Sequence, residues 1–228
     1  MRIQKYLSQE GILSRREAEK AIRDGKVMLN GKIIREMGVQ IDPAKDKVEV
    51  VGTEKSEEKI TVVVYKPRGV VSSTNSAEGK TVHEAFPQFK NLNAVGRLDK
   101  GSEGLLLLSN DGVITAAVTS EKHLIEKEYE VTVREDVMPA QLKRMEEGIV
   151  LDGEKTLPAK AKKLDKHLFS LILTEGRTHQ IRRMADAVHL TIERLVRVRI
   201  GAITLKGLNA GKSRMLTAKE VATLKKLR

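Results

Sequence analysis

The 228-residue sequence contains no cysteine and no tryptophan, and only three tyrosines and three phenylalanines. The absence of cysteine excludes disulfides, a thiolate nucleophile and cysteine-based metal sites. So few aromatic residues also argue against a sheet that stacks several nucleotide bases. No apolar run approaches the roughly 18 residues that a membrane span requires, and no apolar signal core follows Arg2 and Lys5 at the N-terminus. We therefore expect a soluble protein of the cytoplasm with no membrane partner.

The charge is abundant and unevenly distributed. Lysine and arginine number 42 against 31 acidic residues, which gives a formal net charge of +11. Residues 1–50 hold 11 basic and 8 acidic side chains, residues 160–228 hold 17 and 5, and the segment between them holds 14 and 18. Two basic regions around an acidic segment predict a polyanion held from two sides, and nucleic acid is the commonest large polyanion. The alternative is a basic protein whose charge serves solubility alone.

The first fifty residues begin with two helix signals. The spacing of Ile3 and Leu7 predicts a short helix that ends at Gly11. Ser14 and Glu17 form a capping box at the start of a second helix. On a helical wheel the alanines and the isoleucine of this second helix fall on one side. Three basic side chains, which we call the basic stripe, fall together on another side: Arg16, Lys20 and Arg23.

A hairpin signal follows the second helix. Val27–Leu29 and Lys32–Ile34 flank an Asn-Gly pair at 30–31, the typical turn of a β-hairpin. The whole run SRREAEKAIRDGKVMLNGKII resembles the S4 RNA-binding module. The resemblance implies a helix pair that docks on structured RNA, with Arg15 and the basic stripe in contact with it. The alternative for these charges is a solvated helix face.

A polar segment separates this module from the rest of the chain. Residues 53–59 (TEKSEEK) contain no apolar side chain, which predicts a linker that permits hinge motion. The alternation in Lys47–Val51 places a strand just before it, and Ile60–Tyr65 starts a strand after it. We therefore divide the chain into a module at 1–52, a linker at 53–59 and a second domain at 60–228.

The segment that points to chemistry is VGRLDKGSEGLLLLSNDG, residues 95–112. Leu105–Leu108 is a short continuous apolar run, typical of a strand buried on both faces, and the NDG at 110–112 predicts a turn. Asp99 therefore lies on a loop just before a buried strand, where a rigid scaffold often holds working residues. Taken alone, such an aspartate is more often a carboxylate that stabilises a turn.

This segment resembles the signature of the ribosomal RNA pseudouridine synthases of the RsuA/RluB-like family, which also carry an N-terminal S4 module. Further matches follow in the family's order: KEYEV at 127–131, EGRTHQIRRM at 175–184, RLVRVRIG at 194–201 and LTAKE at 216–220. The resemblance covers nearly the whole chain. It implies an α+β protein, in which the S4 module precedes a catalytic domain with a mixed, mainly antiparallel sheet flanked by helices. It also implies an isomerase that converts uridine to pseudouridine in ribosomal RNA without a metal or another cofactor.

The reaction requires a carboxylate, because a glycosidic bond must break and no redox, phosphoryl or metal step is involved. By resemblance that carboxylate is Asp99, acting either as a nucleophile or as a base. A carboxylate that stays ionised in a water-poor cavity needs a cationic partner, and the resemblance assigns this role to Arg182. Arg183 is the neighbouring candidate, which points about 100° away on the same helix. The target base must leave its stack, and Tyr129 is the matching aromatic residue. Without the motif, Tyr129 would be read as a half-buried strand residue.

The C-terminal basic region contains a dense cluster of arginines. Arginine suits phosphate forks and stacking on bases, so we expect these side chains to hold the RNA backbone rather than read its sequence. Those assigned to RNA contact are Arg177, Arg183, Arg197 and Arg199, together with Arg97 from the loop before Asp99. For Arg97, a salt bridge to the core is an equal alternative.

Other motifs carry less weight. Gly207–Ser213 has three residues between its glycines where a phosphate loop needs four. The five histidines show no metal-ligand spacing, and His179, next to the basic helix, is expected to face solvent rather than RNA. Two functions remain: an enzyme that modifies ribosomal RNA, or a non-catalytic RNA-binding or ribosome-assembly protein on the same fold. The opening KYLSQEGILSRREAE resembles the large-subunit members of the family more than the small-subunit ones, which implies 23S rather than 16S ribosomal RNA as the partner. We expect a monomer.

Overall fold

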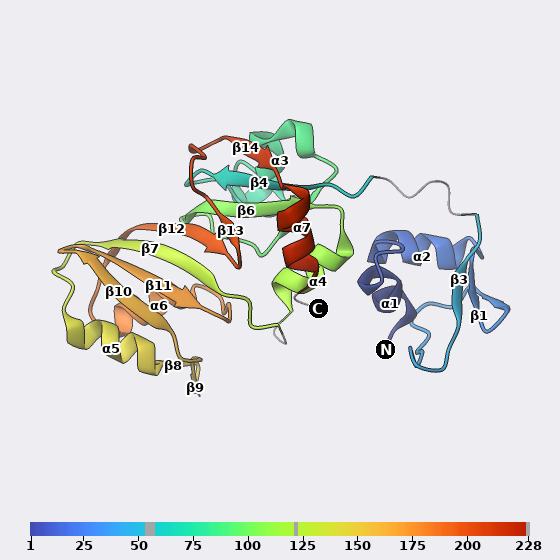
Figure 1. Ribbon diagram of the computed structural model, residues 1–228, viewed down its shortest axis with the longest axis horizontal. Coiled ribbons are helices and arrows are strands. Elements are labelled where there is room, and N and C mark those ends of the chain that lie inside the picture. The colour runs from blue at the N-terminus through green and yellow to red at the C-terminus, as the bar shows by residue number, and fades with distance from the viewer. Residues whose placement is uncertain (53–57, 121–122, 227–228) are drawn as a thin grey trace.

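The computed structural model describes residues 1–52, 58–120 and 123–226. Figure 1 shows the first fifty residues (blue) as a separate group beside a larger, sheet-based part. Most of the expected linker at 53–59 lies outside the described residues. The division of the chain at that point therefore stays a prediction.

The N-terminal group has two helices and three short strands. Its elements are α1 (Ile3–Gln9), α2 (Arg15–Arg23), β1 (Val27–Leu29), β2 (Lys32–Ile34) and β3 (Val48–Val50). The strands form a sheet in the order β2-β1-β3, and the apolar sides of both helices bury Ile3, Leu7 and Ile22 completely. The predicted helices and hairpin are confirmed.

Local chemistry sets the boundaries of these elements. Ser14 Oγ accepts a hydrogen bond from Glu17 N at 3.2 Å, and the Glu17 carboxylate accepts one from Ser14 N at 2.6 Å, so the capping box is complete. Asn30 and Gly31 both have positive φ, 50° and 79°, as the tight turn of a two-residue hairpin requires.

The larger part is built on a nine-stranded sheet. Its central order is β10-β11-β7-β12-β6-β4-β14, with β13 beside β12 and β5 beside β6. The strands are β4 (Thr61–Lys66), β5 (Asn93–Val95), β6 (Glu103–Ser109), β7 (Lys127–Val133), β10 (Lys160–Asp165), β11 (Leu168–Leu173), β12 (Ile192–Ile200), β13 (Ile203–Thr204) and β14 (Ser213–Met215). Among these described strands, β6 and β12 pair in parallel and the other pairs are antiparallel. The expected mixed, mainly antiparallel sheet is confirmed.

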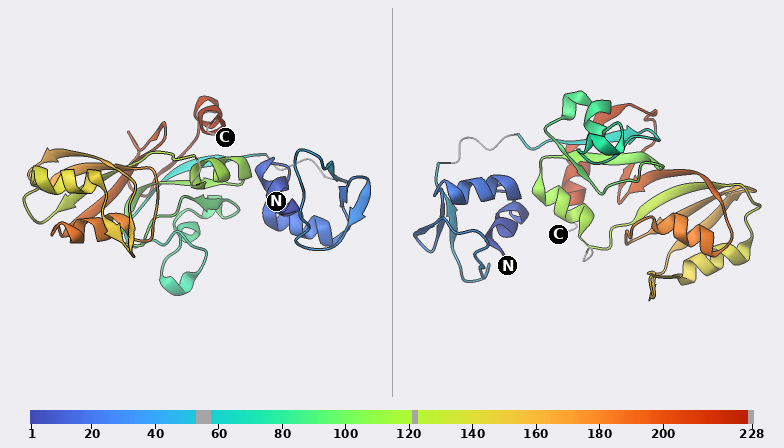
Figure 2. Two further views of the ribbon diagram at one scale, coloured as in Figure 1. Left: turned by 90° about the horizontal axis from the view of Figure 1, so that it is seen from below. Right: turned by 180° about the vertical axis from the view of Figure 1, so that it is seen from behind.

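Helices cover both faces of this sheet. They are α3 (Val82–Ala85), α4 (Gly112–Thr119), α5 (Pro139–Glu147), α6 (Gln180–Ala187) and α7 (Ala218–Lys225), with short turns η1 (Ser76–Glu78) and η2 (Pro87–Phe89) and a small hairpin of β8 (Val150–Leu151) and β9 (Glu154–Lys155). In both views of Figure 2, α5 and α6 (yellow and orange) lie at the end of the molecule away from the N-terminal group.

The leucine run in β6 is buried from both sides, as predicted. Leu105 and Leu107 pack in the cluster that includes α4 and α7, whereas Leu106 and Leu108 pack in the cluster that includes α3. All four side chains are fully buried. A strand that carries apolar residues on both faces gives the loop before it a rigid base.

The turn expected at 110–112 is instead the start of a helix. Asp111 caps α4, because its Oδ1 accepts a hydrogen bond from Val113 N at 2.9 Å. Its other oxygen forms an ion pair with Lys225 of α7 at 2.9 Å. Asp is favoured in turns and at helix N-caps alike, so the local sequence does not separate the two.

Strands β6 and β12 join the two halves of the sheet. Their pairing consists of Val196 with Glu103 and Arg197 with Gly104. The strands approach so closely here that a Cβ on Gly104 would lie 2.4 Å from the carbonyl oxygen of Arg197, and the φ of Gly104 is +106°. This position therefore requires glycine.

Candidate active site

A cleft of about 110 Å³ lies between the loop before β6 and the loop before α6. The three side chains predicted to be catalytic, Asp99, Tyr129 and Arg182, all line it, and so does Arg97. They come from three segments that are distant in the sequence: the loop before β6, strand β7 and helix α6. The fold thus brings together the groups that the sequence motifs named.

Hydrogen bonds hold the loop that carries Asp99 in place on both sides of this residue. Before it, Ser72 Oγ donates to the carbonyl of Leu98 at 2.8 Å and accepts from its N–H at 3.1 Å. After it, the carbonyl of Lys100 accepts from Gly69 N at 2.8 Å. The Asp99 side chain itself is 39% exposed. The carboxylate is therefore held at a fixed place and stays open to a substrate.

Arg197 is not an RNA contact, contrary to the prediction, because its side chain is buried beneath this loop. It is only 1% exposed. Its Nε donates to the carbonyl of Leu105 at 2.8 Å, Nη2 donates to the carbonyl of Gly96 at 2.6 Å, and Nη1 reaches that of Arg97 at 3.5 Å. One guanidinium thereby ties β12 to β6 and to the backbone that leads into Asp99. Its role is to position the loop.

Tyr129 stands next to this arginine, since the two residues are paired across β7 and β12. The tyrosine is partly buried and packs against two of the apolar clusters, one on each half of the sheet. Burial lowers the pKa of Arg197, and the neighbouring Tyr129 and Asp99 partly offset that effect. A buried cation thus lies next to both Tyr129 and the backbone that leads into Asp99.

Arg182 lies beside Asp99 but is turned toward the backbone. Its Nη2 donates to the carbonyl of Gly101 at 2.9 Å and reaches Ser102 Oγ at 3.5 Å. Among the described residues, the ion pair that Asp99 makes is with His179, whose Nε2 lies 3.7 Å from Asp99 Oδ1. Arg182 therefore holds the turn that follows the carboxylate.

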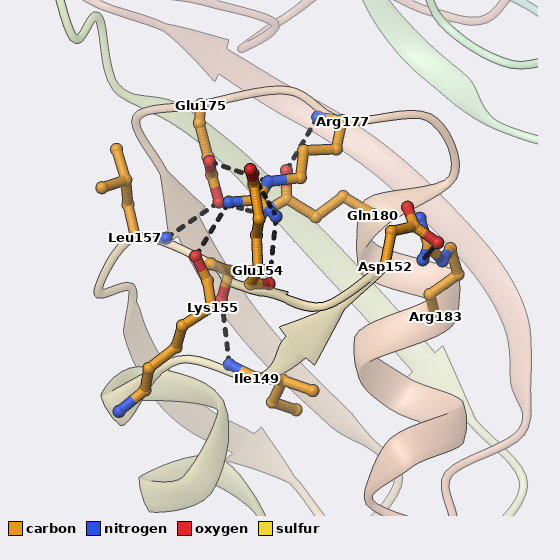
Figure 3. A network of polar contacts seen from close by, with 10 residues as sticks. Ile149, Asp152, Glu154, Lys155, Leu157, Glu175, Arg177, Gln180 and Arg183 are labelled. Atoms are coloured by element: carbon orange, nitrogen blue, oxygen red, sulfur yellow. Dashed lines mark hydrogen bonds and ion pairs between the residues drawn. The ribbon is translucent and has the colours of Figure 1, made fainter.

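Arg177 and Gln180 belong to an internal polar network rather than to a free basic surface (Figure 3). Arg177 pairs with Glu175 at 3.2 Å and donates to the carbonyls of Glu154 and Lys155, at 3.1 and 2.8 Å, in the β8–β9 hairpin. Gln180, only 4% exposed, accepts from Arg177 N at 2.9 Å and donates to Glu175 at 2.6 Å. The network fixes the loop before α6.

Arg183 is also held internally. It pairs with Asp152 of the β8–β9 turn at 2.6 Å (Figure 3) and is not among the residues that line the cleft. Arg182 and Arg183 thus diverge on the helix, as their spacing predicted. The RNA contacts expected of Arg177 and Arg183 compete with these internal pairs.

Arg199 lies on the opposite face of the sheet from the cleft. It forms ion pairs with Glu126 at 3.1 Å and Glu128 at 2.7 Å. It lines a second cavity of about 380 Å³, which is larger than the cleft but contains none of the predicted catalytic residues. The RNA contact expected of Arg199 would therefore compete with these ion pairs and lie on the face opposite the cleft.

The remaining basic residues assigned to RNA are open to solvent. Arg15 and the basic stripe are exposed along α2, and Arg97 is exposed at the cleft. Their contact with RNA stays a prediction.

Lys66 does not line the cleft but interacts electrostatically with Asp99, and the motif search did not single it out. It ends β4, is fully buried, and donates to the carbonyls of Val70 at 2.6 Å and Pro67 at 3.1 Å. Burial lowers the pKa of Lys66 to about 8, and the negative charge of Asp99 counteracts this effect. The signal was available, since the lysine completes a strand of buried residues just before a proline.

The described part of the chain offers no group of three or more His, Asp or Glu side chains suited to a metal ion. Within the same residues, no helix is long and apolar enough to cross a membrane.

Comparison with known proteins agrees with the site. Residues 60–187 match the RNA pseudouridylate synthase family, and residues 1–46 match the S4 domain. The chain belongs to the RNA pseudouridylate synthase family. Of the two functions expected from the sequence, the enzyme is confirmed, and so is the S4 module.

Relatives match along the full length of this pseudouridylate synthase. Ribosomal large subunit pseudouridine synthase B of Bacillus subtilis is 39% identical over 99% of this chain and 96% of its own. Dual-specificity RNA pseudouridine synthase RluF of Escherichia coli K12 is 35% identical over 100% of this chain and 79% of its own. A crystal structure of a pseudouridylate synthase superposes with a TM-score of 0.73 at 34% identity, covering 98% of this chain and 99% of that one.

Proposed function

We propose that this enzyme isomerises a uridine of large-subunit ribosomal RNA and that Asp99 supplies the essential carboxylate. The observation that carries the proposal is the cleft, where a partly exposed carboxylate on a fastened loop faces Tyr129 and Arg182. The full-length relative named for the ribosomal large subunit supports that choice of RNA.

Asp99, Tyr129 and Arg182 each have a separate role in the reaction. The N1–C1′ bond of uridine breaks, the base turns, a C5–C1′ bond forms, and the proton on C5 is replaced by one on N1, so atoms balance without an oxidant. Asp99 serves as nucleophile or base in the first step. Tyr129 packs against the flipped base, and its hydroxyl is available for the proton on C5. Arg182 holds the Asp99 turn and contributes positive charge to the cleft.

The RNA is held from two directions. Arg15 and the basic stripe on α2 bind the phosphate backbone of a structured region, and Arg97 binds it at the cleft. The enzyme acts as a monomer in the cytoplasm, with ribosomal RNA or an assembly intermediate as its partner and no membrane partner. Light scattering of the purified protein, with and without RNA, tests the monomer.

The first experiment is pseudouridine mapping of ribosomal RNA from cells that lack the gene. The cells are complemented with wild type, Asp99→Asn, or Asp165→Asn, a matched change at the exposed end of β10. We expect one large-subunit site to disappear and to return with wild type and Asp165→Asn only.

The other outcomes separate the parts of the proposal. A missing site in the small subunit or in another RNA would overturn the choice of substrate. Full restoration by Asp99→Asn would overturn the role of the carboxylate.

A further inference from the structure

The local sequence does not predict the backbone conformation of His179. It is the N-cap residue of α6 and lies in the left-handed region, with φ 50° and ψ 28°. A residue with a Cβ rarely adopts this conformation, and where one does, the surrounding structure holds it there, commonly at a functional site. Its side chain does not cap the helix, so capping is not the reason for the strain.

The polar network before α6 enforces this conformation. Gln180 accepts from Arg177 N at 2.9 Å, and Gln180 N donates back to the carbonyl of Arg177 at 3.2 Å, so the two residues on either side of the turn are linked. Arg183 N then donates to the carbonyl of His179 at 3.0 Å, as the helix begins. With the turn closed on both sides, the His179 side chain lines the cleft.

The His179 imidazole lies beside the solvent-exposed part of the Asp99 carboxylate. His179 Nε2 lies 3.7 Å from Asp99 Oδ1, and the two side chains are 58% and 39% exposed. The distance is longer than a hydrogen bond, but hydrogen bonds of reacting groups are often long without substrate and tighten when it binds. Arg182 and Arg197, the arginines that contact this loop, already donate to its backbone carbonyls at Gly101 and Gly96.

We propose that His179 positions Asp99 for reaction: its Nε2–H donates to the carboxylate as RNA fills the cleft and fixes the orientation of the reacting carboxylate oxygen. The inference rests on the proposed role of Asp99. The donor is the neutral imidazole or its cation alike, and one carboxylate oxygen stays free. His179 acts through Asp99 and is therefore a positioning residue.

Two substitutions at His179 test this role. His179→Leu removes the donor, and His179→Gln keeps an N–H group at similar reach. The control is His189→Leu, because His189 is exposed and has the same left-handed backbone, φ 59°, beyond the other end of α6 and away from the cleft. The substrate is ribosomal RNA purified from the deletion strain. Single-turnover rate, RNA affinity and urea stability are measured for each variant.

We expect His179→Leu to slow the single-turnover rate about tenfold, the effect of losing one hydrogen bond to a reacting group, and to leave RNA affinity within about twofold. His179→Gln should recover most of the rate, and His189→Leu should match wild type. An unchanged rate in His179→Leu would overturn the proposal. So would a loss that appears in affinity alone, which would make His179 an RNA contact, or a His179→Gln variant no faster than His179→Leu.

The Asp99→Asn variant in the same assay separates this inference from the proposed function. If Asp99→Asn reacts like wild type, the role of the carboxylate fails and the positioning role fails with it. If Asp99→Asn is inactive while His179→Leu is fully active, only the role of His179 fails.

Discussion

Replacing Arg197 with methionine should destabilise the fold, because this guanidinium is a buried connector. Its two shortest hydrogen bonds, at 2.8 and 2.6 Å, go to carbonyls of Leu105 and Gly96. A hydrogen bond to a charged group contributes about 1.5–3 kcal/mol, and a carbonyl left buried without a donor adds a further penalty. The substitution also removes a buried charge and its desolvation penalty, which recovers part of the lost stability.

We therefore expect Arg197→Met to lower the free energy of unfolding by about 3 kcal/mol. For a chain of this size that corresponds to a fall in Tm of about 6–12 °C. Urea unfolding followed by circular dichroism measures the change, and an unaltered m value shows that the midpoint shift reports stability. The rate on RNA should fall as well, since the loop that carries Asp99 loses its attachment.

Arg199→Met is the matched control on the same strand. Arg199 is 22% exposed, pairs with two glutamates and donates to the carbonyl of Gly201, so its loss should cost about 1–2 kcal/mol, less than the loss of Arg197. The reasoning fails if Arg197→Met is as stable as wild type. A variant that keeps its stability but binds RNA more weakly, with a shallower salt dependence, would instead make Arg197 an RNA contact.

Three further perturbations have distinct expected results. Gly104→Ala should cost about 2–4 kcal/mol in urea unfolding, because its Cβ would overlap the carbonyl of Arg197; Gly153→Ala, with φ +81° but open space around it, should cost only about 1–2 kcal/mol. Neutralising the basic stripe should weaken RNA binding and reduce the slope of log affinity against log salt concentration by about two to three released counterions. Unchanged RNA binding would contradict the prediction that α2 faces the RNA. The Arg214 ion pair lowers the pKa of Glu220 to about 2. The stability this provides is present above pH 4.5 and is lost as pH falls toward 2, so an acid titration should be flatter for Glu220→Gln.

Elements determined by local chemistry could be predicted from the sequence. The capping box at Ser14, the Asn-Gly turn and the four-leucine strand each depend on contacts within a few residues or on burial alone. The cleft was predictable by a different route, since motif resemblance named Asp99, Tyr129 and Arg182 as partners without any knowledge of the path between them.

The arginines of β12 could not be assigned in this way. Simple alternation puts Arg197 and Arg199 on the same face of a strand. The register of β12 against β7 shifts between them, so Arg197 turns under the Asp99 loop while Arg199 lines the cavity on the other face. Such a bulge depends on the pairing with the neighbouring strand, so the residue types of β12 do not predict it.

The motif search missed both His179 and Lys66, for different reasons. The left-handed turn at His179 depends on Gln180, which is itself held by Glu175, and that arrangement exists only once the β8–β9 hairpin has packed against the loop. The burial of Lys66 depends on carbonyls of the turn that follows it. The turn at His179 is thus a tertiary property of an ordinary residue, whereas Lys66 is marked in the sequence by the buried strand before it and the proline after it.

The parallel seam between β6 and β12 has a mechanical consequence. Asp99 belongs to one half of the sheet and Tyr129 to the other, and the backbone pairing that joins the halves consists of Val196 with Glu103 and Arg197 with Gly104. The spacing of the reacting groups is therefore a property of this joint. A change that lets the two halves shift by a fraction of an ångström would slow the reaction before either half unfolds. Catalytic rate is thus the more sensitive gauge of this interface, and heat should impair turnover at temperatures where the secondary structure is still intact.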